Sequence, residues 1–151
     1  MRNKINIHEL SNTPLKIFSD ERGSVMRFLK SNSASFTDFG EAYFSKINHG
    51  VVKGWKLHEN VSQNFSVPHG VIKVVVYDNR EDSPTEGVIN EFILNSSDHY
   101  TILSIPKGVW YSFKGLTEGY SLLANIINID HSLAVSHVLP LDNEIVPYKW
   151  T

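Results

Sequence analysis

The sequence predicts an all-β fold, a jelly roll or β-barrel in which a single domain spans residues 1–151. Val, Ile, Phe, Tyr and Trp recur in short runs separated by clusters of Gly, Pro, Asn, Asp and Ser, the usual residues of turns. No long segment shows the periodicity of an amphipathic helix. At 151 residues the chain can bury one core and leaves little room for a second domain.

Strands are expected wherever apolar and aromatic residues alternate with polar ones or form a short apolar run. In chain order, these stretches are residues 24–30, 39–48, 51–58, 63–67, 71–78, 88–94, 100–105, 109–113 and 120–129. Segments typical of turns or loops separate them, over residues 18–23, 31–38, 49–50, 59–62, 68–70, 79–87 and 106–108. About eight to ten strands at this spacing favour a jelly roll or barrel.

Three stretches carry further expectations. In the leading segment, residues 5–17, Pro14 favours a sheet edge or a bend. Residues 71–78 are almost continuously apolar, which predicts a strand that is buried on both faces. The irregular C-terminal segment ends in aromatic residues, and we expect the rings of Tyr148 and Trp150 to dock on the barrel.

Composition excludes several classes of function. The 14 basic and 16 acidic residues are nearly balanced, so we expect no general attraction to nucleic acid or to an anionic membrane. The absence of cysteine excludes a disulfide scaffold and a thiolate nucleophile. No apolar run approaches the roughly 18 residues that span a bilayer, and residues 1–9 are mixed polar. We therefore expect a cytoplasmic protein.

The stretch from Val51 to Asn60 carries the polar side chains of greatest interest. If it is a strand, alternation places Gly54, Lys56 and His58 on one face, and the other face holds Val51, Lys53, Trp55 and Leu57. A lysine and a histidine inside a barrel are costly to bury unless each finds a partner or water, which favours a functional role. A surface strand with two solvated polar residues is the alternative.

Metal binding and nucleotide-loop chemistry are not expected. Metal-binding β-barrels typically place two histidines two residues apart on one strand, and here Lys56 stands where the first would precede His58. We therefore expect no metal and no other cofactor. No Gly-x-Ser-x-Gly elbow or Gly-rich phosphate loop occurs. The histidines near predicted turns are expected to be solvated or capping groups: His49, His69, His99, His131 and His137.

Removal of a proton next to a ketone fits these residues better. That reaction needs a base, a group that stabilises the enolate oxygen, and an acid on the opposite face if configuration inverts. His58 or a desolvated Lys56 could be the base, and the other could stabilise the oxygen. Tyr111, on the predicted strand over residues 109–113, could supply the acid.

Several separated motifs together resemble the dTDP-4-dehydrorhamnose 3,5-epimerase (RmlC-like) family of sugar-nucleotide cupins. They are Asp20-Glu21-Arg22-Gly23, Glu41 with Tyr43 and Ser45, residues 50–54, Asp78-Asn79-Arg80 with the Ser83-Pro84-Thr85-Glu86-Gly87 run, and Ile105-Pro106-Lys107-Gly108 with Phe113. The resemblance implies a cupin jelly roll, usually a homodimer. It also implies metal-free action on a nucleotide-linked 4-keto-6-deoxy sugar, with dTDP or another nucleoside diphosphate.

The resemblance departs from the family at the catalytic positions. The family's base, a histidine, matches Lys56, so that His58 follows two residues later on the same face. The family's catalytic tyrosine falls at about Ala124, with Asn125 next to it, and a family histidine falls at Tyr111. The scaffold and its diphosphate-binding positions are retained, whereas the acid and base residues are replaced.

The resemblance also supplies the remaining candidate residues. Asp142 matches the aspartate that orients the family's base, with Asp130 as a competing candidate. The expected catalytic set is His58, Lys56, Tyr111 and Asp142. The expected substrate-binding set is Arg22, Lys53, Glu41, Gln63, Asn64, Asn125 and Trp110. Asp78 and Arg80 are more typical of a charge pair that pins a turn than of catalysis.

Two functions follow from this reading. The first is an epimerase or ketoisomerase for a nucleotide-linked 4-keto-6-deoxy sugar, in surface-polysaccharide or deoxysugar biosynthesis. The second is a cupin that binds a sugar nucleotide or glycan without converting it, because the family's catalytic tyrosine is missing.

Overall fold

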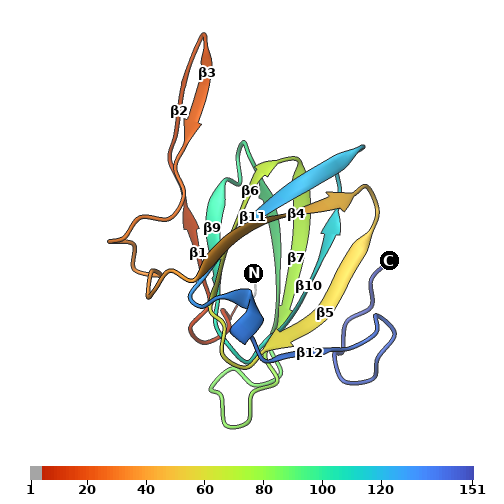
Figure 1. The fold of residues 1–151 in the computed structure, drawn as a ribbon. Helices are drawn as coiled ribbons and strands as arrows, with labels where there is room; N and C mark the ends of the chain where they lie inside the picture. Colours follow the sequence, from red (N-terminus) through yellow and green to blue (C-terminus); the bar gives the residue numbers. More distant parts are fainter. Residues whose placement is uncertain (1–4) are drawn as a thin grey trace.

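The computed structural model describes residues 5–151 as two facing antiparallel sheets of five strands each and a separate two-stranded hairpin (Figure 1). The first four residues of the predicted polar N-terminus lie outside the described part. One sheet has the order β1 (Ser11–Pro14), β9 (Thr101–Ile105), β6 (Gln63–His69), β11 (Tyr120–Ile127), β4 (Glu41–Asn48). The other has the order β12 (Ser136–Val138), β5 (Val52–His58), β10 (Trp110–Gly115), β7 (Val71–Tyr77), β8 (Ile89–Asn95). The predicted all-β class is confirmed.

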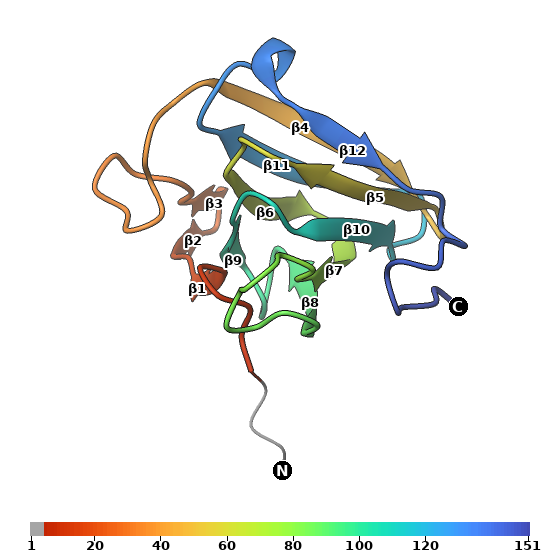
Figure 2. The ribbon, with the colours of Figure 1, turned by 90° about the horizontal axis from the view of Figure 1, so that it is seen from below.

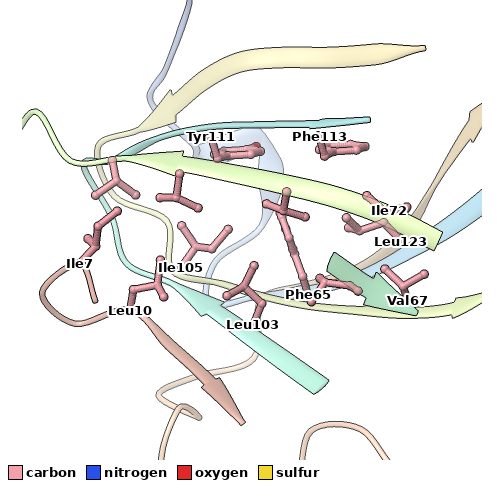
Figure 3. Close-up of a cluster of buried hydrophobic side chains, with 14 of the residues drawn as sticks. Ile7, Leu10, Phe65, Val67, Ile72, Leu103, Ile105, Tyr111, Phe113 and Leu123 are labelled. Atoms are coloured by element: carbon pink, nitrogen blue, oxygen red, sulfur yellow. The ribbon is translucent and has the colours of Figure 1, made fainter. Parts of the chain in front are cut away.

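The main core lies between the two sheets, where side chains of β4 and of β6 to β11 point inward (Figure 3). Phe65 of β6 meets Phe113 of β10 edge to face, with ring centroids 6.4 Å apart. Around them lie aliphatic side chains from both sheets, among them Ile47, Ile72, Val74, Val76, Leu94, Leu103, Ile105 and Leu123. This shared core fixes the spacing of the sheets and therefore the space available between them.

Strand β7 is buried on both faces, as predicted. Its alternate residues enter the main core, while Val75 and Tyr77 join a second cluster on the outer face of the sheet. The C-terminal segment covers that cluster, and the rings of Tyr148 and Trp150 pack against it, which confirms the expected docking. Trp150 also donates a hydrogen bond from Nε1 to Oγ of Ser112, at 3.1 Å.

The pairing of β5 with β10 is irregular, and this changes which residues face inward. Tyr111 pairs with Lys56, but Ser112 pairs with Gly54, so the ladder skips Trp55. Lys56 and His58 face inward as predicted. Lys53 pairs with the inward-facing Phe113 and shares its side of the sheet, so its predicted outward position is wrong.

The N-terminal hairpin differs from expectation. Strand β2 (Ile17–Asp20) and strand β3 (Gly23–Met26) pair with each other, and the turn is confined to Glu21 and Arg22. The hairpin projects away from the two sheets (Figure 1). A further strand, β12, lies in the C-terminal segment that sequence periodicity marked as irregular. The only described helix is the 3₁₀ turn η1 (His131–Leu133), and no helix of residues 5–151 is long and apolar enough to cross a membrane.

Asp78 pins the loop between β7 and β8, as the sequence indicated. Its fully buried carboxylate accepts hydrogen bonds from Arg80 Nε at 2.9 Å and from the Ser83 and Thr85 hydroxyls, each at 2.7 Å. Arg80 also pairs with Glu9 at 3.0 Å, which ties the N-terminal segment to the loop. Burial alone would raise the pKa of Asp78, but these hydrogen bonds hold it well below its ordinary value.

We predict that Asp78→Ala lowers the free energy of unfolding by about 3 kcal/mol, because the variant leaves Arg80 and two hydroxyls without their buried acceptor. Urea denaturation at pH 7 measures this. Since the pKa of Asp78 is depressed in the folded state, its contribution is present above the unfolded value of about 4 and is lost as the pH falls below it. The matched control, Asp98→Ala at an exposed site, should change stability by less than about 0.5 kcal/mol. Equal effects of the two variants would contradict the role of Asp78.

Candidate functional site

A cavity of about 510 Å³ opens between the edges of the two sheets, a volume within the range of small-molecule sites. Its lining residues belong to strands β4, β5 and β10 and to the segment that passes through η1 to β12. Figure 2 shows how these strands are arranged. The lining residues are Glu41, Tyr43, Ser45, Lys53, Gly54, Trp55, Lys56, Tyr111, Phe113, His131 and Val138. Four of them, Lys53, Lys56, Tyr111 and Glu41, belong to the predicted site.

Lys56 is the amine on the cavity wall beside Tyr111, its direct partner on β10. Its side chain is partly buried and makes no hydrogen bond or ion pair within residues 5–151. A partly buried amine with an unused donor set is ready to contact a polar ligand.

His58 lies behind the cavity wall and is only 3% exposed. Its Nδ1 is 2.7 Å from Oγ of Ser136, and its Nε2 is 3.0 Å from the hydroxyl of Tyr111. A neutral imidazole carries one ring proton, so the ring donates in one of these contacts and accepts in the other. Burial, followed by the nearby Lys56 and His131, lowers the pKa of His58 to about 4, which keeps the ring neutral near pH 7.

The contacts of His58 continue as a polar network across the interior. Gln63 hydrogen-bonds the hydroxyl of Tyr111. Asn125 then donates from its amide to Oε1 of Gln63 and to the hydroxyl of Tyr43, both at 3.0 Å. The network therefore runs from β12 through four further strands to β4, with the order Ser136, His58, Tyr111, Gln63, Asn125, Tyr43.

Both tyrosines of this network have pKa values above the ordinary value. Burial is the main cause for each, and the neighbouring Tyr43 adds to it for Tyr111. For Tyr43, the hydrogen bond from Asn125 opposes burial, while the carboxylate of Glu41 adds to it. Both phenols are therefore protonated near neutral pH and can act as hydrogen-bond or proton donors.

His131 is exposed to solvent, as the sequence indicated, and it also lines the cavity. Its ring lies edge-on to Tyr43, with centroids 6.0 Å apart, and 6.3 Å from the ring of His58. Its backbone N–H donates to Oε1 of Glu41 at 3.0 Å, which fixes η1 to β4. For Tyr43 the sequence left two positions open, the pocket or a dimer seam, and Tyr43 lines the cavity. The site placement of His131 and Ser136 was missed, because only the long-range return of the chain brings η1 and β12 to the cavity.

Four predicted residues lie away from the cavity. Asp142 is exposed in the C-terminal segment, and the position beside Nδ1 of His58 is taken by Ser136 instead. Asp130 is also exposed and caps η1 through the N–H of Ser132. Trp110 belongs to the outer cluster that contains Trp55. The side chain of Asn64 accepts a hydrogen bond from Ser104 at 2.7 Å, on the outer face of its sheet.

The two basic residues predicted to bind the substrate occupy different places. Lys53 is at the cavity rim, where its Nζ donates to the backbone oxygen of Lys46 at 2.7 Å. Arg22 is at the turn of the projecting hairpin, where it pairs with Asp20 at 2.7 Å and is 84% exposed. Within one chain, therefore, only Lys53 of this pair can reach the cavity.

Within residues 5–151, no group of three or more His, Cys, Asp or Glu side chains is arranged to hold a metal ion. Among the groups that line the cavity are the amine of Lys56, the phenols of Tyr43 and Tyr111, the imidazole of His131 and the carboxylate of Glu41.

Comparison with known proteins identifies one family. Its sequence model, described as dTDP-4-dehydrorhamnose 3,5-epimerase, matches residues 4–149. The chain is 34% identical over 122 residues to the probable low-salt glycan biosynthesis epimerase Agl13 of Haloferax volcanii, covering 80% of this chain and 78% of that protein. It is 29% identical over 134 residues to the spore coat polysaccharide biosynthesis protein SpsL of Bacillus subtilis, covering 87% and 88%.

A solved structure is similar over nearly the whole chain. It is the crystal structure of a dTDP sugar isomerase from Desulfovibrio desulfuricans G20, with a TM-score of 0.92 and 38% sequence identity. The match covers 95% of this chain and 92% of that one. The scaffold around the cavity is therefore shared with it.

We predict that His58 makes the protein less stable as the pH falls from about 6.5 to about 4, since the unfolded state binds a proton in that window and the folded state does not. The loss should reach about 3 kcal/mol, and His58→Asn should remove that slope. Urea midpoints at stepped pH values measure it, with the exposed His99→Asn as control. A His58 ring signal that titrates near pH 6.5 in NMR spectra would contradict the prediction.

Proposed function

The chain belongs to the dTDP-4-dehydrorhamnose 3,5-epimerase family, and from this premise we propose that it is an epimerase or ketoisomerase for a nucleotide-linked 4-keto-6-deoxy sugar. The family's cupin-type jelly roll, expected from the sequence, is confirmed. The observation that carries the proposal is the convergence of Lys56, two phenols and His131 on one cavity. Its relatives in glycan and polysaccharide biosynthesis favour the same pathway class for this chain.

The proposed chemistry starts with a proton next to the ketone. The ketone acidifies that carbon because the electron pair of the broken C–H bond can move onto oxygen as an enolate. Lys56 stands where the family has its base and lines the cavity, so its amine is proposed to remove the proton. His58 is buried behind the wall, and in this proposal it positions Tyr111 rather than touching the substrate.

Tyr111 is proposed to stabilise the enolate oxygen. It lines the cavity next to Lys56, and its raised pKa keeps the proton that it would donate in a hydrogen bond. The contacts from His58 and Gln63 hold the hydroxyl in place before the substrate arrives. Because a hydrogen bond meets the enolate charge, the proposed reaction is independent of metal and of any cofactor.

The nucleotide portion is proposed to bind along the rim. Its diphosphate is anionic, and Lys53 supplies a cation there, while Glu41 can accept hydrogen bonds from sugar hydroxyls. The family favours dTDP as the nucleotide. As expected from the sequence, we place the activity in the cytoplasm.

Arg22 is proposed to act in a second copy of the chain, in a homodimer. The hairpin that carries it projects away from its own sheets, and Phe18 and Val25 on it are 54% and 58% exposed. Exposed apolar side chains on a projecting hairpin favour burial against a partner. Arg22 would then reach the partner's cavity rim and pair with the diphosphate.

We predict that Lys56→Ala lowers the rate of solvent deuterium uptake next to the ketone by about 10²-fold to 10⁴-fold, because the base is lost. Proton NMR in deuterated water, with a panel of 4-keto-6-deoxy sugar nucleotides, measures the uptake. Lys107→Ala, at an exposed turn, is the matched control and should leave the rate unchanged. If the unmutated protein binds these nucleotides in calorimetry but exchanges no proton, it is a binding cupin and the enzyme proposal fails.

We predict that Arg22→Ala raises KM about 10-fold or more with little change in kcat, because a diphosphate contact is lost in both the bound substrate and the transition state. Glu21→Ala, its neighbour in the turn, should have little effect.

Subunit mixing tests whether Arg22 acts in the partner. A mixed dimer of the Arg22→Ala and Lys56→Ala variants contains one cavity with both residues intact, so mixing should restore part of the activity at low substrate concentration. Measured activity equal to the sum of the separate variants, in dimers shown to have exchanged subunits, would place Arg22 outside the partner's site.

A further inference from the structure

We propose that Tyr43 is the general acid of this reaction, which protonates the substrate carbon from the wall opposite Lys56. The inference rests on the proposed function and extends it to a residue on another strand. It replaces the role of acid that the sequence indicated for Tyr111.

The pairing of β4 with β11 relates Tyr43 to the position that matches the family's catalytic tyrosine. The family's catalytic tyrosine falls at about Ala124, and Ala124 pairs with Phe44, which is 71% exposed on the outer face. The neighbouring inward position on β11 is Asn125, whose amide is not an acid at neutral pH. The residue that pairs directly with Asn125 is Tyr43, so the phenol stands one strand away from the expected place.

Tyr43 and Lys56 reach the cavity from different sheets. Tyr43 extends from β4, at the edge of one sheet, and Lys56 extends from β5 in the other. Inversion at a carbon requires that one group removes the proton on one face and another delivers a proton on the opposite face. A sugar ring between the two walls has the amine on one side and the phenol on the other.

The hydrogen bonds of Tyr43 leave its proton available. The amide of Asn125 donates to the Tyr43 oxygen at 3.0 Å, so this contact uses a lone pair and not the phenolic hydrogen. The hydroxyl of Tyr111, in contrast, is held by His58 and Gln63 and already serves the enolate oxygen in the proposed function, and Tyr111 is only 7% exposed. Within residues 5–151, the Tyr43 hydroxyl has one side-chain hydrogen-bond partner, Asn125, and it can still donate its own hydrogen to a ligand.

The surroundings of Tyr43 also suit an acid. Burial and the carboxylate of Glu41 keep the phenol protonated until it is required, against the weaker opposing effect of Asn125. The ring of His131 lies edge-on to it with centroids 6.0 Å apart, and this contact restricts the direction of the phenol.

The proton inventory of the proposed step is balanced. Lys56 takes the proton as the C–H bond breaks, and the electron pair forms a carbon–carbon double bond while the carbonyl π pair moves to oxygen. When the ketone re-forms, the carbon takes the proton of the Tyr43 hydroxyl. The ammonium of Lys56 then loses a proton to water and the phenolate of Tyr43 gains one, so that both return to their starting states without oxidation or reduction.

Tyr43→Phe tests the inference, because it removes the hydroxyl and keeps the ring. We expect epimer formation to fall by about 100-fold or more, while the substrate still exchanges its proton with deuterated water at close to the normal rate. Exchange persists because Lys56 can return a solvent deuteron to the same face. Substrate affinity and thermal unfolding should change little.

The matched control is Tyr120→Phe, on a phenol at the exposed end of β11, which should leave both rates unchanged. A second measurement uses fluorinated tyrosine at position 43, which acidifies the phenol. The high-pH limb of the kcat profile should then move to lower pH, a change that a merely structural role would not produce.

The outcomes separate the two proposals. Absence of exchange in the unmutated protein contradicts the proposed enzyme itself. Normal epimer formation by Tyr43→Phe overturns the assignment of Tyr43 and leaves the proposed enzyme standing. If His131→Gln then loses epimer formation, the acid is His131. Loss of both exchange and epimer formation in a folded, substrate-binding Tyr43→Phe variant would also overturn it, because Tyr43 would then act before the acid step.

Discussion

The buried polar network between Ser136 and Tyr43 is the constraint on which the site depends. Polar groups between two packed sheets are costly unless each finds a partner, so their positions are fixed by one another. Gln63 and Asn125 are the centre of this arrangement, because each amide contacts groups on both sides. The result is that the phenols on two different sheets are held in fixed positions before any ligand binds.

The network also explains how a family scaffold can carry a changed set of reactive groups. By the sequence resemblance, Lys56 matches the family's histidine. The nearby His58 contacts the hydroxyl of Ser136 at its Nδ1, where a carboxylate was expected. Burial, together with the nearby Lys56 and His131, lowers the pKa of His58 to about 4. A buried, neutral His58 is suited to holding the Tyr111 hydroxyl in place, whereas the amine of Lys56 lines the cavity.

Much of the fold followed from the sequence because the alternation of apolar residues and the turn residues are local signals. Alternation also places adjacent residues of a strand on opposite faces of the sheet. Tyr111 and Gln63 therefore face inward, whereas their neighbours Trp110 and Asn64 face outward. The inward position of Lys53 could not be predicted, because the alternation of apolar and polar residues gives no sign of the irregular pairing at Trp55.

The mouth of the site was not predictable for a different reason. Strand β12 has only three residues, too short for a periodic signal, and its pairing with β5 depends on contacts between residues far apart in the chain. The aspartates expected there, Asp142 and Asp130, are both exposed to solvent. The sequence resemblance predicted an aspartate as the partner of the base. In the structure, the hydroxyl of Ser136 on β12 contacts Nδ1 of His58.

Gly54 limits how this cavity can diverge in evolution. Its φ is +119°, and a Cβ there would lie 2.8 Å from the backbone of Ser112, so any other residue is excluded by both conformation and space. The cavity wall beside Lys56 therefore cannot be reshaped at its centre. New ligand preferences are expected from side chains around that fixed point, chiefly at the rim position of Lys53 and at His131 on the η1 segment.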